Sequence, residues 1–324
     1  MSMLGHVDAV GHDGADAFRH EAFLHDGDAE FLAGAVPYIR EGLEAGDIVL
    51  VLVTAPRVAL LRRELGSDAD RIHLADMTAI GRNPTRIISA WGSLVAEHAV
   101  DGRRIRGLGE PVWPGRNDAE LVECSHHEAL LNLAFADTPG FQLLCPYDVG
   151  ALDPAVVGDA QRTHPTYLRG GTRRTSPTYR GSHAAHAALD APLPDPPGEP
   201  VEIPIEPGAL AEVRHFAANH AAARGFGRQR VQDVVLTVSE LATNTVVHGG
   251  GHGLLRIWQE GDALVHEVRD PGVIREPLVG RRRPTPGQLG GRGLWLVNEV
   301  CDLVQLRSSA AGTVVRAHLR PHPN

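Results

Sequence analysis

Hydrophobic side chains follow two alternating patterns through the first half of the chain. Residues 28–44 carry apolar side chains at helical spacing, and the run at 48–53 is continuously apolar, as in a strand buried on both faces. The alternation continues, in chain order, with a helix at 56–65, a strand at 71–74, a helix at 85–100, a strand at 105–108, a helix at 118–135 and a strand at 141–145. Such an order predicts an α/β domain with a parallel sheet and helices on its faces.

From residue 201 onward the order of the patterns changes. The spacing of apolar residues predicts, in chain order, a strand at 201–205, helices at 209–224 and 228–248, strands at 254–259 and 264–269, a helix at 294–300 and strands at 303–308 and 313–319. Consecutive strands favour antiparallel pairing, so this part is predicted to be a separate α+β domain.

The composition marks the boundaries of these domains. Residues 170–200 contain paired glycines and the proline-rich sequence PLPDPPG, which is typical of a semi-extended linker. Residues 1–17 are polar and are expected to form a loose N-terminal arm. The first domain is therefore placed at 18–169 and the second at 201–324.

Composition and charge also exclude several classes of protein. The chain is 43% hydrophobic and 22% charged, which supports packed cores, and its net charge of −9 disfavours nucleic-acid binding. All 31 basic residues are arginine, and without lysine there is neither a Walker-type phosphate loop nor a Schiff-base residue. Three scattered cysteines, no long apolar run and no signal-like N-terminus predict a cytoplasmic protein that does not contact a membrane.

The predicted helix at 228–248 places a row of polar side chains beside its apolar stripe. Spacings of four, three, four and four residues put this row on one helix face, and its members are Asp233, Thr237, Glu240, Asn244 and His248. Such a row is either a solvated surface or the wall of a binding site.

Two glycine-bearing loops further along the chain favour a binding site. Asp270-Pro271-Gly272 directly follows a predicted strand, and the sequence GGRGL at 290–294 opens a predicted helix. A glycine-rich turn at a helix N-terminus presents free N–H groups to an anion. A carboxylate at a strand end can accept a hydrogen bond from the amino group of a base.

Together these segments resemble the nucleotide-binding boxes of the GHKL ATPases, in the form found in anti-sigma factor serine kinases. The sequence ELATNTVVHG at 240–249 resembles the N-box, DPG at 270–272 the G1 box and GGRGL at 290–294 the G2 box. The resemblance implies a Bergerat-type (GHKL) ATP-binding sandwich, with ATP and Mg²⁺ as cofactors.

The resemblance also implies a role for each motif residue. Glu240 would act as a general base toward a substrate hydroxyl, Asn244 would hold Mg²⁺, and Asp270 would bind the adenine amino group. His248 would either line the phosphate end of the site or only cap its helix. The residues expected to contact the cofactor are Asn244, His248, Asp270, Gly272, Gly290, Gly291, Arg292, Gly293 and Leu294.

The match departs from the family at two places. Ile274 stands where the G1 box usually has a second glycine. The short segment between the boxes holds Arg281, Arg282 and Arg283, which either neutralise phosphate charge or lie in solvent. Of these two alternatives we expect solvent.

The first domain resembles the MEDS sensory domain, a RecA-like α/β module. The resemblance rests on GEPVW at 109–113, EALLN at 128–132 and LCPYD at 144–148. TAPR at 54–57 stands where a RecA-like fold has its phosphate loop, so ATP hydrolysis is not expected there. A small-molecule ligand is expected near the strand ends. The candidate residues, for which packing roles are at least as good an explanation, are Glu110, Trp113, Glu128 and Tyr147.

Cysteine and histidine residues in the first domain raise the question of a metal site. Cys124, His126, His127 and Cys145 show no Cys-x-x-Cys spacing, and the two cysteines belong to different predicted elements. A metal site formed by these residues is therefore disfavoured.

These features lead to three hypotheses of function. The first is an ATP/Mg²⁺-dependent protein serine/threonine kinase of the anti-sigma type, with a STAS-type anti-anti-sigma protein or a sigma factor as partner. The second is a non-catalytic switch in which nucleotide binding controls the affinity for such a partner. The third, a sensor histidine kinase, is disfavoured because a proline-rich linker stands where a dimerising helical hairpin belongs. Whether the chain forms a homodimer is left open.

Overall fold

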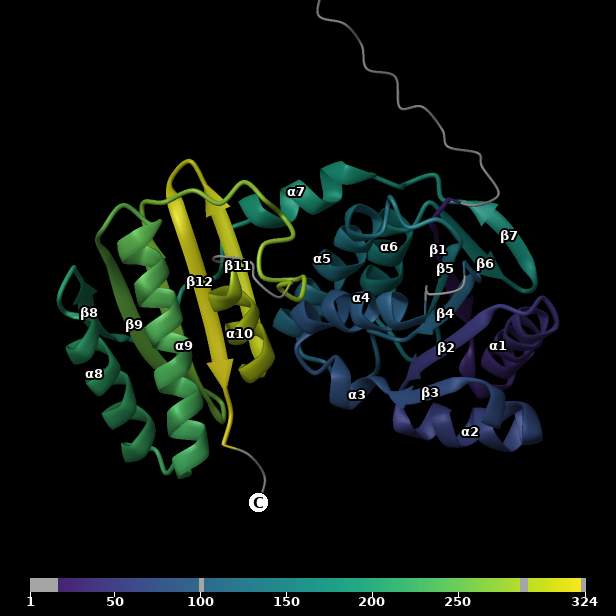
Figure 1. Cartoon of the computed structure of the whole chain (residues 1–324), viewed down its shortest axis with the longest axis horizontal. Helices are drawn as coiled ribbons and strands as arrows, with labels where there is room; N and C mark the ends of the chain where they lie inside the picture. The colour runs from purple at the N-terminus through teal and green to yellow at the C-terminus, as the bar shows by residue number, and fades with distance from the viewer. Residues whose placement is uncertain (1–16, 99–101, 286–290, 322–324) are drawn as a thin grey trace, which may run out of the picture.

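The chain folds into two domains that lie side by side (Figure 1). The computed structural model describes residues 17–98, 102–285 and 291–321. Each domain is built around one sheet, and the two sheets have different topologies.

A seven-stranded, mostly parallel sheet forms the centre of the first domain. Its strands lie in the order β3-β2-β4-β5-β1-β6-β7, and only β6 and β7 pair antiparallel. The elements are β1 (Arg19–His25), α1 (Gly27–Glu44), β2 (Ile48–Val53), α2 (Ala55–Leu65), η1 (Gly66–Arg71), β3 (His73–Asp76), α3 (Met77–Ile80), η2 (Pro84–Arg86), α4 (Ile87–His98), β4 (Ile105–Gly109), α5 (Asp118–Ala134), β5 (Phe141–Asp148), α6 (Pro154–Thr163), β6 (Thr166–Arg169) and β7 (Thr172–Thr175). The predicted α/β class is confirmed.

Helices cover both faces of this sheet, so it has two apolar layers. Trp91, Phe141 and Tyr147 belong to the layer under α4 and α5, and Phe31 and Leu61 to the layer under α1 and α2. Burial of the strands on both faces explains why β2 reads as an uninterrupted apolar run. No helix among the described residues is long and apolar enough to cross a membrane.

Strand β1 lies inside the sheet, between β5 and β6, although the hydrophobic pattern does not predict it. Its sequence, RHEAFLH, begins with three charged or polar residues, yet six of its seven residues are buried. Glu21 is accommodated because Thr166 Oγ1 donates a hydrogen bond to it at 2.8 Å and Arg173 forms an ion pair with it. Polar partners from β6 and β7 therefore allow β1 to be buried although its sequence is not apolar throughout.

The second domain is a five-stranded antiparallel sheet with helices packed on one face (Figure 1). The strand order is β11-β12-β10-β9-β8, which leaves β11 and β8 at the edges. The elements are β8 (Val201–Ile205), α8 (Leu210–Ala223), α9 (Arg228–Val247), β9 (Gly253–Glu260), β10 (Ala263–Asp270), α10 (Arg292–Val300), β11 (Leu303–Ser309) and β12 (Gly312–Leu319). This arrangement confirms the predicted α+β sandwich of the GHKL class.

Residues 170–200 contain more regular structure than a linker. Strand β7 closes a hairpin with β6, and α7 (Ser182–Asp190) follows it. Helix α7 packs against α5 of the first domain and β11 of the second, and Figure 1 shows it bridging the two. The alanine-rich sequence of α7 forms a helix because these neighbours supply the packing that so short a helix needs.

A buried carboxylate, that of Glu123 in α5, joins the two domains. Its side chain is fully buried and lies 2.7 Å from Arg307 Nη2 in β11 and 3.6 Å from Arg281 Nη2. Burial alone would raise the pKa of Glu123, but the neighbouring His126, Arg307 and Arg281 hold that pKa at about 2. The interface thus contains an ionised carboxylate that balances arginine charge.

Asn83, just before η2, supplies a second connection between the domains. The fully buried Asn83 donates a hydrogen bond from Nδ2 to the carbonyl oxygen of Asn298 at 2.9 Å. Its Oδ1 accepts a hydrogen bond from the backbone N–H of Val304 at 3.3 Å. Asn83 therefore binds both α10 and the edge strand β11.

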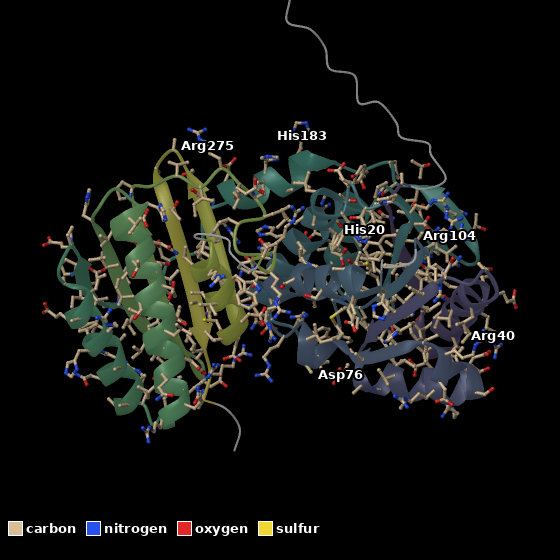
Figure 2. The ribbon with its side chains drawn as sticks, in the orientation of Figure 1. His20, Arg40, Asp76, Arg104, His183 and Arg275 are labelled. Carbon is tan, nitrogen blue, oxygen red and sulfur yellow. The ribbon has the colours of Figure 1, made fainter. Side chains whose placement is uncertain are left out.

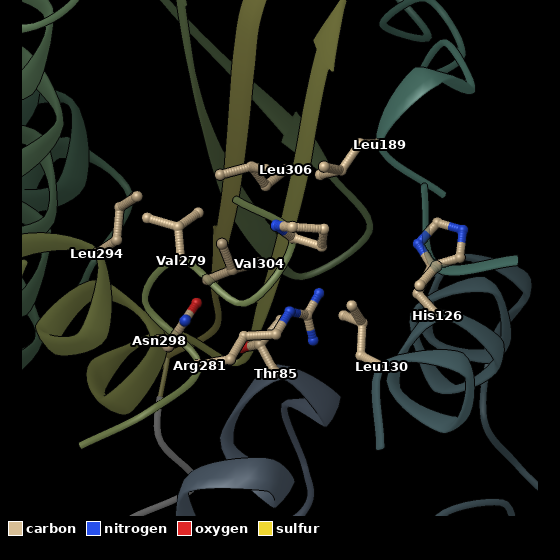
Figure 3. A pocket seen from close by; sticks show the side chains of 12 residues that line it. Thr85, His126, Leu130, Leu189, Val279, Arg281, Leu294, Asn298, Val304 and Leu306 are labelled. Carbon is tan, nitrogen blue, oxygen red and sulfur yellow. The ribbon is translucent and has the colours of Figure 1, made fainter. Parts of the chain in front are cut away.

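The space between the domains is small around Arg281, whereas wider pockets of about 310–380 Å³ lie between them elsewhere. Figure 3 shows Arg281 of the second domain lying near Thr85 and Leu130 of the first, around a cavity of about 20 Å³. A cavity of this size is about that of a single water molecule. The domains are therefore closely packed at this point.

Replacing Glu123 by glutamine is expected to destabilise the protein by about 3–5 kcal/mol, because Arg307 and Arg281 would stay buried without a counter-charge. The control is Glu41→Gln, since Glu41 is 68% exposed and its ion pair with Arg106 is worth at most about 1 kcal/mol. Urea denaturation followed by tryptophan fluorescence measures the difference. Equal midpoints for the two variants would contradict the buried ion-pair assignment.

Candidate functional site

Helix α9 carries the polar row predicted from the sequence, but the structure divides this row. Thr237 is fully buried and lies 3.3 Å from Cys301 Sγ, while Asp233 forms an ion pair with Arg230 at 3.1 Å. Glu240 and Asn244 are half-buried and His248 is exposed. Only the C-terminal half of the row is therefore open to a ligand.

Asp270 stands at the end of β10, opposite the end of α9. Its Oδ2 accepts a hydrogen bond from Thr245 Oγ1 and its Oδ1 accepts one from the backbone N–H of Gly272, both at 2.9 Å. These bonds fix the carboxylate, and each oxygen keeps a second lone pair for a ligand. Thr245 is part of the site, although the sequence interpretation did not select it.

Two glycines allow the backbone to approach Asp270 closely. A Cβ atom at Gly249 would lie 2.5 Å from Asp270 Cγ, and a Cβ at Gly272 would lie 2.7 Å from the Cα of Gly249. No side chain fits at either position without moving the carboxylate or the loop. Gly272 and Gly249 therefore both have a steric role beside Asp270, and the contact of Gly272 with a nucleotide stays a prediction.

The start of α10 packs against the open face of α9. Gly291 caps this helix in the left-handed conformation, with φ of 77°. A Cβ at Gly293 would lie 2.7 Å from Glu240 Oε2 and 3.4 Å from Asn244 Nδ2. Gly293 therefore brings the helix N-terminus, where unpaired N–H groups favour anions, next to both polar side chains.

The other residues of the GGRGL motif have different positions. Arg292 is exposed at the first turn of α10, and Leu294 lines the pocket described below. Gly290, which was also predicted to contact the cofactor, lies outside the described residues.

These elements enclose a pocket of about 90 Å³ between α9, β10, β12 and α10. Its polar side chains are those of Asn244, His248, Asp270 and Thr313, and most of the wall is apolar. The pocket is lined by Leu241, Asn244, His248, Gly249, Val268, Asp270, Gly272, Val273, Ile274, Leu294, Thr313 and Val315. An apolar slot with one carboxylate on its wall suits a flat heterocyclic base whose amino group donates to that carboxylate.

Ile274 and His248 both belong to this pocket. Ile274, which replaces the usual second glycine, lines the wall, and its backbone N–H donates to Ser308 Oγ at 2.7 Å. His248 forms the C-cap of α9, with its N–H donating to Asn244 O, and also lines the pocket. The structure thus shows the capping role of His248, and its contact with the phosphates stays a prediction.

The side chains of Asn244 and Glu240 are available to a ligand. Within the described part of the chain, neither side chain takes part in a hydrogen bond or an ion pair. The amide oxygen of Asn244 is a hard donor of the kind that Mg²⁺ prefers, and Glu240 offers a carboxylate beside it. This donor set fits one Mg²⁺ held mainly by phosphate oxygens and water.

The three consecutive arginines do not share one environment. Arg282 and Arg283 are exposed, as expected, and Arg282 Nη2 donates to the carbonyl oxygen of Ala134 at 2.9 Å. For Arg281 the expectation of a solvated side chain is wrong, because this residue is buried and faces Glu123. The reason is the first domain, which supplies a counter-charge that local sequence does not reveal.

In the first domain, side chains of the protein fill the place of the phosphate loop. Arg57 Nη1 lies 2.5 Å from Glu110 Oε1, and Arg57 Nη2 lies 3.2 Å from Asp148 Oδ2. Burial raises the pKa of Glu110, while Arg57 and Thr54 oppose the shift. Trp113 stacks on Arg116, with the guanidinium 3.6 Å from the ring centroid. Of the candidate ligand residues, Glu110 thus balances charge and Trp113 packs.

Family models match both domains. Residues 19–165 match the model of MEDS, the methanogen/methylotroph DcmR sensory domain, and residues 203–319 match that of the histidine kinase-like ATPase domain. The chain therefore combines a MEDS domain with a histidine kinase-like ATPase domain. The latter class of domain binds ATP.

Comparison with individual proteins adds little to this assignment. The crystal structure of the RsbU and RsbW domains of Rv1364c from Mycobacterium tuberculosis is similar at 20% identity and a TM-score of 0.30. The match covers 39% of this chain and 34% of that one, so this chain spans about a third of its length. No curated protein matches the chain.

Replacing Gly249 by alanine is expected to abolish ATP binding, because the added Cβ would displace the Asp270 carboxylate. Calorimetric titration with ATP measures the effect. Gly227→Ala is the control, since a Cβ at this helix N-cap meets no atom within 4 Å. This substitution is expected to lower the free energy of unfolding by only about 0.5 kcal/mol. Unchanged affinity in Gly249→Ala would show that Asp270 does not contact the nucleotide.

Proposed function

We propose that the protein is an ATP/Mg²⁺-dependent serine/threonine kinase of the anti-sigma type, with its MEDS domain as the sensory part. One observation carries this proposal: Glu240 and Asn244 lie beside the start of α10, and Asn244 shares one pocket with Asp270. The partner would be a STAS-type anti-anti-sigma protein or a sigma factor, in accord with the motif resemblance. Activity on such a partner would regulate transcription.

The geometry supports a division of roles along the pocket. Asp270 and the apolar wall would hold adenine, so that the phosphates point toward Asn244 and the N-terminus of α10. Asn244 would hold Mg²⁺, which when bound neutralises charge on the phosphates. Glu240 would accept the proton of a serine hydroxyl as its oxygen attacks the γ-phosphorus and ADP leaves.

Contacts of α10 give the first domain a route to this site. The helix packs on α9 through Gly293, and on the first domain through Trp295, whose Nε1 donates to Ser89 Oγ at 3.1 Å. Glu299 of the same helix forms an ion pair with Arg86 at 3.2 Å. A ligand that shifts α4 or η2 would therefore move the helix that faces the phosphates, which is how we propose that a signal reaches the ATPase domain.

A non-catalytic switch remains the second candidate. The same pocket would bind nucleotide, and the position of α10 would then set the affinity for a partner without phosphoryl transfer. A sensor histidine kinase fits less well, since the segment before β8 holds a nine-residue helix, α7, packed between the domains. Neither alternative changes the proposed nucleotide site.

Calorimetry with Mg·ATP tests the nucleotide site. The wild type is expected to bind, and Asn244→Ala and Asp270→Ala are each expected to weaken binding by about 10- to 100-fold, through loss of interactions with charged groups worth about 1.5–3 kcal/mol. The control is Asn219→Ala, which changes an exposed asparagine on α8. Failure of the wild type to bind nucleotide would reject both the kinase hypothesis and the switch hypothesis.

Phosphoryl transfer separates the kinase from the switch. With a STAS-type partner and Mg·ATP, Glu240→Gln is expected to slow transfer by about 10²- to 10⁴-fold, because a general base is lost, while nucleotide affinity stays near that of the wild type. Transfer by Glu240→Gln at the wild-type rate would reject Glu240 as base. Nucleotide binding without transfer by the wild type would favour the switch, and acid-labile phosphate on the chain itself would favour a histidine kinase.

A further inference from the structure

Four side chains with metal-binding atoms converge inside the first domain. They are His20 from β1, Glu128 from α5, Cys145 from β5 and His164, which follows α6; Figure 2 shows His20 in the interior of this domain. One ligand atom from each residue lies within 4.8 Å of the other three, and all four residues are at most 3% exposed. The cluster is separate from the nucleotide site and from the interface.

Hydrogen bonds on the far side of each imidazole fix the ring orientation. His164 Nδ1 lies 2.8 Å from the carbonyl oxygen of Ala160, which can only accept, so Nδ1 carries the proton. His20 Nδ1 lies 3.2 Å from Asn132 Oδ1, and the amide orientation is set because Asn132 Nδ2 donates to the carbonyl oxygen of Thr163 at 2.9 Å. Both rings therefore turn Nε2 toward the centre of the cluster, as metal-bound histidines commonly do.

The centre of the cluster is electrostatically incomplete without a cation. Nε2 of His20 and of His164 lie 2.8 Å and 3.1 Å from Glu128 Oε2. Among the described residues, neither oxygen of Glu128 nor Nε2 of His164 has a partner in hydrogen-bond geometry. With neutral rings, nitrogen lone pairs face a buried carboxylate. With one ring protonated the charges balance, but the lone pair of the other ring still faces the carboxylate. With two protonated rings, whose centroids are 4.0 Å apart, a net positive charge is buried instead.

We infer that His20, Glu128, Cys145 and His164 form a closed, structural Zn²⁺ site. The Zn²⁺ charge is balanced by the Glu128 carboxylate and the Cys145 thiolate, whose S–H proton is released to solvent when the metal binds. In a tetrahedral site with Zn–N of about 2.0 Å and Zn–S of about 2.3 Å, neighbouring ligand atoms lie about 3.3–3.6 Å apart. The distance of 3.5 Å between Cys145 Sγ and His20 Nε2 lies in this range. The distances of 2.8 Å and 3.1 Å from Glu128 Oε2 to the two Nε2 atoms are shorter, so the carboxylate would move outward on binding the ion.

The positions of the ligands explain what such a site would do. The ion would connect two parallel neighbouring strands, β1 and β5, to α5 and to the end of α6. The ligands span residues 20 to 164, so the ion would close long loops and add its binding free energy to folding. All four positions are protein ligands and buried, which marks a stabilising site without an open position for substrate.

The test compares two buried cysteines in the full-length protein. Zinc content is measured after expression with added zinc, and Co²⁺ is then exchanged into the protein. The wild type and Cys124→Ala are expected to hold about one Zn²⁺ per chain, and their cobalt forms to show the near-ultraviolet thiolate-to-cobalt band of a tetrahedral site. Cys145→Ala is expected to lose that band, and Glu128→Gln most of the metal. Cys124 is the matched control because it is equally buried and lies outside the cluster.

A measurement on the wild type alone keeps the test independent of variant folding. X-ray absorption of the zinc form is expected to give one sulfur ligand at about 2.3 Å and three nitrogen or oxygen ligands at about 2.0 Å. Removal of zinc by a chelator is expected to lower the melting temperature. A folded wild type that takes up no zinc, a zinc shell without sulfur, or an undiminished thiolate band in Cys145→Ala would each overturn the inference.

Discussion

The relation between the two domains depends on one buried negative charge, that of Glu123. It lies within reach of two arginines that come from different parts of the ATPase domain, a strand and the segment between the glycine boxes. Each arginine would be costly to bury alone, and so would the carboxylate, so the three groups are stable only together. This requirement fixes β11 and the segment around Arg281 against α5, and thereby places α10 between the nucleotide pocket and the first domain.

Much of this architecture is readable from local sequence, because local periodicity and local turn chemistry determine it. Helix α9 and the strands before and after the DPG motif, β10 and β11, follow from their apolar spacing. The observed bounds of these elements differ from the predicted bounds by no more than one residue at either end. Gly272 and Gly293 were also selected from the sequence, and the structure leaves no room for a side chain at either position. The assignment of ATP contacts to these residues stays a prediction.

Features that depend on distant partners were not predictable in this way. The pattern of β1 is polar, and only the hairpin of β6 and β7 explains how Glu21 is buried. Arg281 looks like a solvated residue until Glu123 is placed beside it. Of the cysteines and histidines considered for a metal, only Cys145 joins the buried cluster. Its three partners lie on β1, on α5 and just after α6, far apart in the chain, so no spacing motif exists to reveal them.

The side-chain amide of Asn83 has a consequence for how far the two domains can separate. Strand β11 is at the edge of its sheet, and Asn83 satisfies the backbone N–H of Val304 there as another strand would. If the domains came apart, this N–H would face outward and offer a place where a strand from a second molecule can add. A signal that acts by fully parting the domains would thus invite aggregation, whereas one that tilts α10 by a small amount would not.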